Sequence, residues 1–66
     1  MTEMLKRIIS ELRLRPELGP RELSEILYPK NPAMQPKVAK AMVQLEMMGL
    51  IDGEGKLTFK ALNHVG

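Results

Sequence analysis

Three lysines and a glutamine carry the most distinctive chemistry of this sequence. Lys30, Lys37, Lys40 and Gln44 lie within residues 26–45, a stretch that contains no aspartate or glutamate. Ammonium groups neutralise phosphates, and a glutamine amide can pair with the N6 and N7 edge of adenine. This local excess of positive charge indicates a surface for a polyanion such as nucleic acid. The alternative is an ordinary helix surface whose lysines are simply solvated.

The residues that would position these side chains have the spacing of an amphipathic helix over about residues 35–48. Apolar residues recur at i, i+3, i+4 and i+7, which is typical of a helix that rests on a core. This stripe consists of Val38, Ala41, Met42 and Leu45. Pro36 suits the first turn, where its missing N–H needs no partner. Gly49 suits the end of the helix, and Leu50 can fold back onto it as the apolar contact of the cap.

Two further helices are expected before this one. The first, over residues 2–15, is capped by Thr2 and ended by Pro16. Its apolar stripe is Leu5, Ile8, Ile9 and Leu12. The second, over residues 20–27, begins with proline at its first position. A single helical turn is expected at residues 32–34, within a proline-containing connector.

A small β-hairpin and a last helix are expected after the central helix. Residues 50–51 and 56–58 would form its two strands, joined by a turn in which Gly53 and Gly55 supply positive φ angles. Thr58 can then cap a short helix over residues 59–64. We expect Phe59 and Leu62 to point inward from this helix.

Length and composition narrow the function further. The 66 residues, with a formal charge of +2, predict one domain over residues 1–66. There is no cysteine and only one histidine, His64, so we expect neither a disulfide nor a metal site and no cofactor. No activated nucleophile is evident, which argues against an enzyme. No apolar run is long enough to span a bilayer, so a cytoplasmic protein without membrane contact is expected.

The order of these elements resembles that of a winged helix-turn-helix domain. Residues 21–27, RELSEIL, resemble the second helix of bacterial, archaeal and phage regulators of this family. Residues 38–51 resemble their third helix and its exit, with Leu45-Glu46 and then Gly49-Leu50-Ile51. The resemblance covers nearly the whole chain. It implies a mainly α fold with a small β-hairpin (α+β), that is, three helices, a two-stranded wing and a short C-terminal helix.

The resemblance also implies a small DNA-binding protein, a transcription regulator that places the helix at about residues 35–48 in the major groove. The DNA contacts that it implies are Lys30, Gln35, Lys37, Lys40, Ala41, Gln44 and Lys56. Lys40 can donate to guanine, whereas Lys30 and Lys37 suit phosphates. The predicted wing carries Asp52 and Glu54, which makes it a poor phosphate clamp.

Two other kinds of partner remain open at this point. One is a second copy of the chain, because a DNA-binding module of this size gains specificity by pairing and is expected to act as a homodimer, for which Val43, Met47, Met1 and Met4 offer a surface. The other is a protein-binding module without direct DNA contact, which would use Val43 and Met47 beyond the apolar stripe. RNA binding is disfavoured because the chain has only two aromatic residues, Tyr28 and Phe59.

Overall fold

The computed structural model describes residues 2–63, and the regular secondary structure of that part of the chain is helical. Its elements are α1 (Glu3–Leu14), α2 (Pro20–Leu27), the 3₁₀ helix η1 (Pro32–Met34), α3 (Gln35–Met47) and α4 (Phe59–Asn63). The three helices predicted before residue 49 and the predicted single turn are therefore confirmed, with α3 ending at Met47. In residues 2–63, none of these helices has the length and apolar character that crossing a membrane requires.

The helix ends are satisfied by side chains close in sequence. The Leu5 N–H donates to Oγ1 of Thr2, 3.3 Å away, which confirms Thr2 as the N-cap of α1. At the start of α2, the Gly19 N–H donates to Oε1 of Glu22 at 2.9 Å, and Pro20 occupies the first helical position. Both devices satisfy backbone groups that the helix itself leaves unpaired.

The C-terminus of α3 ends in a left-handed glycine. Gly49 has φ of 78°, its N–H donates to the Glu46 carbonyl at 2.9 Å, and the Leu50 N–H donates to the Leu45 carbonyl at 2.9 Å. This pair of hydrogen bonds is the Schellman motif. Leu50 is buried beneath it, as its expected role as the apolar contact of the cap requires.

The predicted two-stranded wing is wrong, because no β-strand forms in residues 2–63. Residues 50–58 fold back on themselves, but only one antiparallel bridge, Ile51 to Leu57, joins the two sides. The Asp52 side chain takes the place of further strand pairing, since its Oδ1 accepts the N–H groups of Glu54 at 2.8 Å and Lys56 at 3.0 Å. Of the two glycines in this turn, only Gly55 has positive φ. The described chain is therefore a small helical protein with an ordered loop where the wing was expected.

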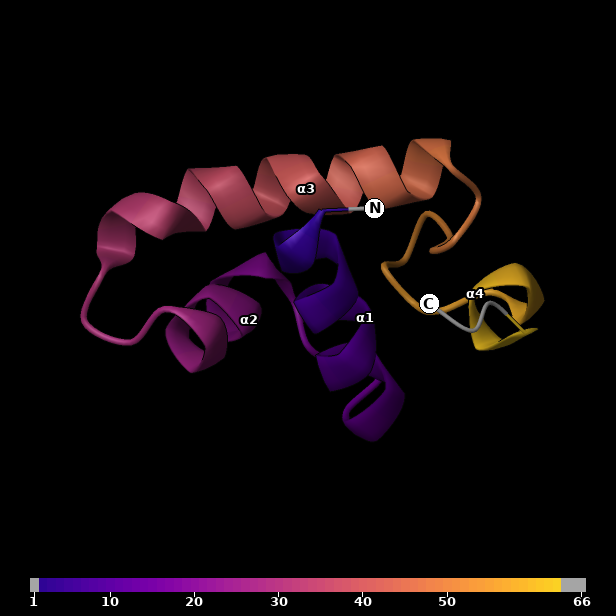
Figure 1. Cartoon of the computed structure of the whole chain (residues 1–66), viewed down its shortest axis with the longest axis horizontal. Coiled ribbons are helices and arrows are strands. Elements are labelled where there is room, and N and C mark those ends of the chain that lie inside the picture. The colour runs from indigo at the N-terminus through magenta and orange to yellow at the C-terminus, as the bar shows by residue number, and fades with distance from the viewer. Residues whose placement is uncertain (1, 64–66) are drawn as a thin grey trace.

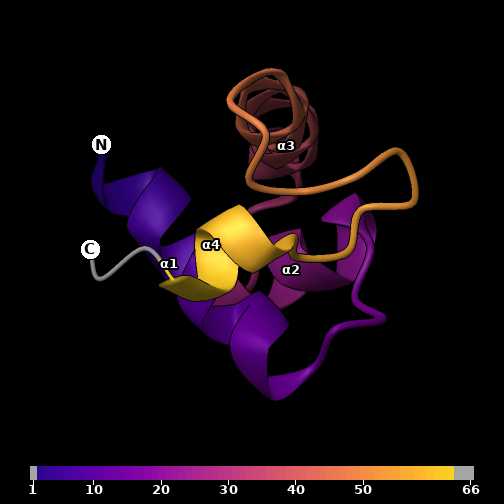
Figure 2. The same cartoon turned by 90° about the vertical axis from the view of Figure 1, so that its right-hand side faces the viewer.

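The helices and residues 50–51 enclose one apolar core, and Figures 1 and 2 show how the helices are arranged. In Figure 1, α3 lies across the top, α1 runs downward beneath it, and α2 lies beneath the first half of α3. The buried apolar residues are Leu5, Ile8, Ile9, Leu12, Leu23, Leu27, Val38, Ala41, Met42, Leu45, Leu50, Ile51 and Ala61. These include the whole predicted stripes of α1 and α3. The core therefore covers one side of α3 and leaves the other side in solvent.

The last helix is oriented differently from the prediction. Phe59 is 85% exposed and Leu62 55% exposed, whereas Ala61 is fully buried. Polar contacts set this orientation: Thr58 Oγ1 donates to the Gly49 carbonyl at 2.6 Å, and Arg13 donates to the Ala61 carbonyl at 3.2 Å. Residues of a helix are about 100° apart, so turning Ala61 inward carries Phe59 to the far side. His64 lies outside the described residues.

Candidate nucleic-acid interface

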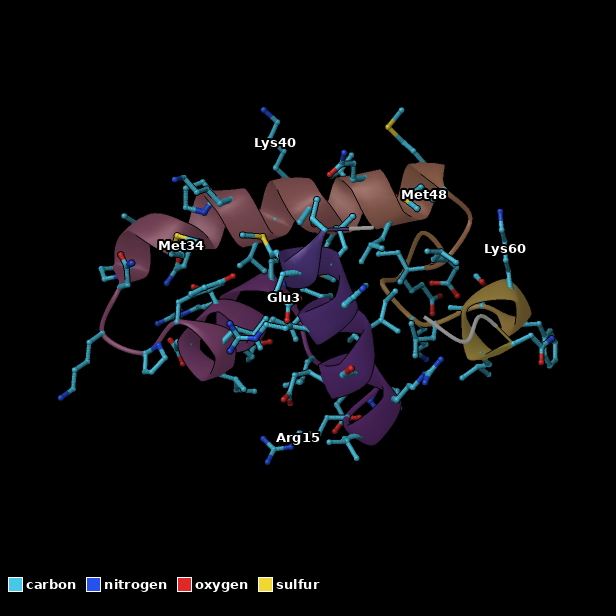
Figure 3. The ribbon with its side chains drawn as sticks, viewed as in Figure 1. Glu3, Arg15, Met34, Lys40, Met48 and Lys60 are labelled. Atoms are coloured by element: carbon cyan, nitrogen blue, oxygen red, sulfur yellow. The ribbon has the colours of Figure 1, made fainter. Side chains whose placement is uncertain are left out.

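The side of α3 that faces away from the core gathers three of the predicted DNA contacts. Lys37, Lys40 and Gln44 are all exposed and follow one another along the helix at i, i+3 and i+7. Figure 3 shows Lys40 projecting from α3 away from the rest of the molecule. In the described part of the chain, neither Lys37 nor Lys40 forms an ion pair. Both ammonium groups are therefore available to an external anion.

The same side of α3 borders an open hollow against the start of α1. This hollow, which we call the α1–α3 hollow, has a volume of about 530 Å³. It is lined by Thr2, Met4, Leu5, Lys37, Lys40, Ala41, Val43, Gln44 and Met47. Val43 is 55% exposed and Met47 83% exposed, so these two apolar side chains stand beside the lysines. The predicted DNA-binding side chains and the predicted protein-binding pair therefore share one surface.

The acidic groups near α3 lie on its opposite flank. Glu46, the acid of α3, borders a second depression that is formed with the loop of residues 52–55. Glu17, Asp52 and Glu54 line the same depression. Among the described residues no acid lines the α1–α3 hollow, so positive and negative charges are separated on the two sides of α3. The separation preserves the positive potential around Lys37 and Lys40.

Lys30 and Gln35 belong to a different depression from the other predicted contacts. They border it together with Glu25 and Tyr28, below the N-terminal end of α3. Lys30 lies in the connector with φ of 66°, an uncommon backbone conformation for lysine. Its side chain is exposed, whereas Gln35 is half-buried. These two residues therefore flank the exposed face of α3 without forming part of it.

Lys56 and Ala41 are placed unfavourably for contact with DNA. Lys56 Nζ lies 3.7 Å from Oε2 of Glu54, within the acidic loop. Ala41 is only 6% exposed and packs in the core, although the resemblance implied a reading position for it. Val43, two residues later, is an exposed apolar side chain of this face. Its methyl groups could meet a thymine methyl, as apolar side chains do in major grooves.

Two contributions to this region were not predicted from the sequence. Lys60 Nζ donates to the Met48 carbonyl at 2.9 Å, and so places a cation at the negative end of α3. Thr2 and Leu5 also line the hollow. The spacing within α1 predicted Thr2 as a cap and Leu5 as a core residue. Their place beside the hollow follows only from the packing of α1 against α3.

The acidic loop is held by its own backbone. The N–H groups of Lys56 and then Glu54 donate to the Asp52 carboxylate, and they lower the pKa of Asp52 from its usual value of 3.8. Hydrogen bonds to the ionised form have this effect because protonation would break them. The Asp52 carboxylate therefore stays ionised to a lower pH than an aspartate without these hydrogen bonds.

The described residues contain no group of three or more His, Cys, Asp or Glu side chains that could hold a metal ion. The exposed face of α3 instead offers ammonium groups, a hydrogen-bonding amide and apolar side chains. No protein-family model, curated protein or solved structure matches the chain.

Proposed function

We propose that the protein binds double-stranded DNA and presents the exposed face of α3 to the major groove. The observation that carries this proposal is the acid-free row of Lys37, Lys40 and Gln44 on the side of α3 that the core leaves in solvent. A helix is the element that fits the major groove. Lysines there supply phosphate or guanine contacts, and the Gln44 amide can read adenine.

The position of Lys30 and the start of α3 support the same orientation. Lys30 is exposed on the connector that leads into the helix, next to the positive end of the helix dipole. Lys30 and Lys37 are therefore suited to phosphates of the strand that borders the groove. Because the described chain has no two-stranded wing, and its loop is acidic, the proposal assigns no groove contact to residues 52–56.

A role in transcription regulation would follow from the resemblance to winged helix-turn-helix regulators, and a homodimer would double the contacted site. A homodimer that binds DNA must leave α3 exposed. A homodimer that pairs through Phe59 and Leu62, which are exposed on α4, would meet this condition. In Figure 1 α4 lies below α3, whereas Lys40 points upward in the same view (Figure 3). Sedimentation of the protein with and without duplex would report the stoichiometry.

The first test is a fluorescence-anisotropy titration of labelled random-sequence duplex at several salt concentrations. Two or three neutralised phosphates predict a slope of log K against log salt of about −2 to −3. Lys37→Gln should make the slope shallower by about one, because Lys37 is the α3 lysine that suits a phosphate. Arg15→Gln is the matched control, because it removes one exposed charge on the side of the molecule opposite Lys40 (Figure 3).

Equal effects of the two substitutions would contradict the placement of DNA on α3, and no binding at low salt would overturn the proposal altogether. If the protein binds, selection from a random pool would give its preferred site. Gln44→Ala should then relax the preference at one or two base pairs, at a cost of about 1–3 kcal/mol per lost bidentate contact. Lys37→Ala should weaken binding to all sequences alike.

A further inference from the structure

The α1–α3 hollow has a floor and a rim of different chemistry. Leu5 and Ala41 are buried and form its base, and half-buried Met4 forms one wall. The rim consists of the exposed side chains of Lys37, Lys40, Val43, Gln44 and Met47. An apolar base beneath a rim with two cations is a surface for an amphipathic ligand, because one part of such a ligand seeks burial and another seeks charge.

DNA contact accounts for the rim but leaves the base unexplained. A duplex offers few apolar atoms, chiefly thymine methyl groups, and these reach only side chains as prominent as Val43. An apolar cavity of about 150 Å³ accommodates one benzene-sized group. The α1–α3 hollow, at about 530 Å³, therefore has room for about three apolar side chains. That number matches the anchors that a helix presents at i, i+3 or i+4, and i+7.

The charges around the hollow are of one sign. Lys37 and Lys40 stand on α3, and the first turn of α1 directs the positive end of its dipole to the same region. Glu3, the acid of that turn, borders a different depression together with Lys6 and Arg7. A partner that covers the hollow must therefore carry negative charge on the flanks of its apolar face.

We infer that the α1–α3 hollow binds an amphipathic helix of a partner protein, with apolar side chains in the hollow and acidic side chains against Lys37 and Lys40. A second copy of this chain fits less well. A two-fold symmetric pair buries the same patch of both copies, so it would bring Lys37 and Lys40 of one copy close to those of the other. Like charges facing each other across an interface oppose association.

The inferred partner would also control the proposed function. Lys37, Lys40 and Gln44 belong to the rim of the hollow and to the DNA-binding face of α3, so the two ligands exclude each other. This competition rests on the proposed DNA binding, whereas the docking surface itself does not. An acidic helix that binds the hollow would compete with DNA for α3 and so release the protein from DNA.

The test uses a labelled synthetic peptide of about 18 residues, long enough to form a helix, with leucines along one face and glutamates elsewhere. A second peptide replaces every glutamate with lysine. Anisotropy should show the glutamate peptide binding about tenfold more tightly, because its contacts with the two rim lysines are attractive and those of the lysine peptide repulsive. Amide shifts of the ¹⁵N-labelled unmodified protein should change at the start of α1 and along α3.

Substitutions separate the two ligands. Met4→Gln places an amide in the wall of the hollow without changing charge, and should weaken the glutamate peptide about fivefold or more while leaving DNA affinity unchanged. Met34→Gln is the matched control, because Met34 is also half-buried but lies in η1, away from the hollow (Figure 3). Gln44→Ala should have the opposite effect: it should alter the DNA sequence preference and change the affinity for the peptide less.

The outcomes distinguish this inference from the proposed function. Peptide binding in the hollow without any DNA binding would support the docking surface and overturn the proposed function. DNA binding that the glutamate peptide does not displace would leave the function standing and overturn the inference. Equal binding of both peptides, shifts confined to α4, or a concentration-dependent dimer that covers α3 would also overturn the inference.

Discussion

Ala41 and Val43 lie two residues apart on α3 and have opposite surroundings. Ala41 packs in the core and Val43 stands in solvent beside Lys40 and Gln44. A helix advances about 200° over two residues, so the burial of one largely determines the exposure of the other. The resemblance assigned a DNA contact to Ala41, whereas the packing of α3 offers Val43 for this role. The exposed face of α3 therefore carries apolar side chains as well as lysines.

Gly49 is expected to be sensitive to substitution because of its backbone conformation. Its φ of 78° is unfavourable for any residue with a Cβ, although the space around it is open enough for a methyl group. Gly49→Ala should lower the free energy of unfolding by about 1–2 kcal/mol, which corresponds to a fall in Tm of roughly 4–16 °C.

The control for this prediction is Gly53→Ala. Gly53 lies outside the positive-φ region, and an added Cβ would meet Glu46 Oε2 at an ordinary 3.8 Å. Its effect should stay within about 0.5 kcal/mol. Thermal unfolding followed by circular dichroism measures both variants, and equal losses would show that the cap at Gly49 contributes nothing special.

Asp52 should make the stability of its loop depend on pH. Because the folded protein lowers the pKa of Asp52, its contribution is present above the unfolded value of 3.8 and is lost as the pH falls below it. Asp52→Asn should therefore be less stable than the unmodified protein at pH 7, and the difference should shrink toward pH 3. Denaturant unfolding across that range measures it, and a difference independent of pH would show that the ionised carboxylate is not the stabilising form.

At the scale of elements, α3 and α4 show how differently two amphipathic segments behave. The long apolar stripe of α3 gives it one stable orientation on the core. With five residues, α4 has too little apolar surface to determine its own orientation, so polar contacts at Thr58, Lys60 and Arg13 decide it. These contacts bury Ala61 and leave Phe59 in solvent. The orientation of such a short helix depends more on its polar contacts than on its hydrophobic pattern.

Loss of the Thr58 hydroxyl should let α4 open more often, because this hydroxyl makes two of the hydrogen bonds that hold the helix. Thr58→Val keeps the side-chain shape but loses the donor to the Gly49 carbonyl and the acceptor for the Ala61 N–H. Native-state hydrogen exchange should accelerate at Ala61 and Leu62 by about fivefold to thirtyfold, which corresponds to about 1–2 kcal/mol. Thr58→Ser keeps the hydroxyl and should restore most of the protection. Unchanged exchange in the valine variant would mean that packing alone holds α4.

On the scale of the whole molecule, the chain is small and its stability margin is correspondingly narrow. Its Cα radius of gyration is 10.8 Å, and the buried residues come from α1 to α4 and from the loop at residues 50–51. A domain of this length has roughly 3–10 kcal/mol of stability. The ion pairs Arg21–Glu25 and Lys56–Glu54 both lie exposed on the surface. Apolar packing therefore supports the fold.

Two leucines of α1 test this dependence on packing. Leu12 is fully buried and Leu14 is 78% exposed, although they are two residues apart in one helix. Leu12→Ala should cost about 2–5 kcal/mol, a large share of the total, whereas Leu14→Ala should stay within about 0.5 kcal/mol. Urea unfolding of both variants gives the comparison. Similar losses at the two positions would contradict the assigned core.

Local patterns were enough to predict α1, α2, η1 and α3, because their caps, prolines and apolar stripes act within one or two turns of the residues concerned. The left-handed cap at Gly49 follows from the same short-range chemistry. These signals also predicted which residues of α1 and α3 form the core.

The wing and the orientation of α4 depend on contacts between segments that the sequence pattern does not reveal. Asp52 satisfies the backbone of its own loop and leaves one bridge where two strands were expected. Packing of α1 against α3 brings Met4 beside Lys40 and so creates the α1–α3 hollow. Residues 36 positions apart line one hollow only because the two helices share a core, which is why the hollow could be found in the tertiary structure alone.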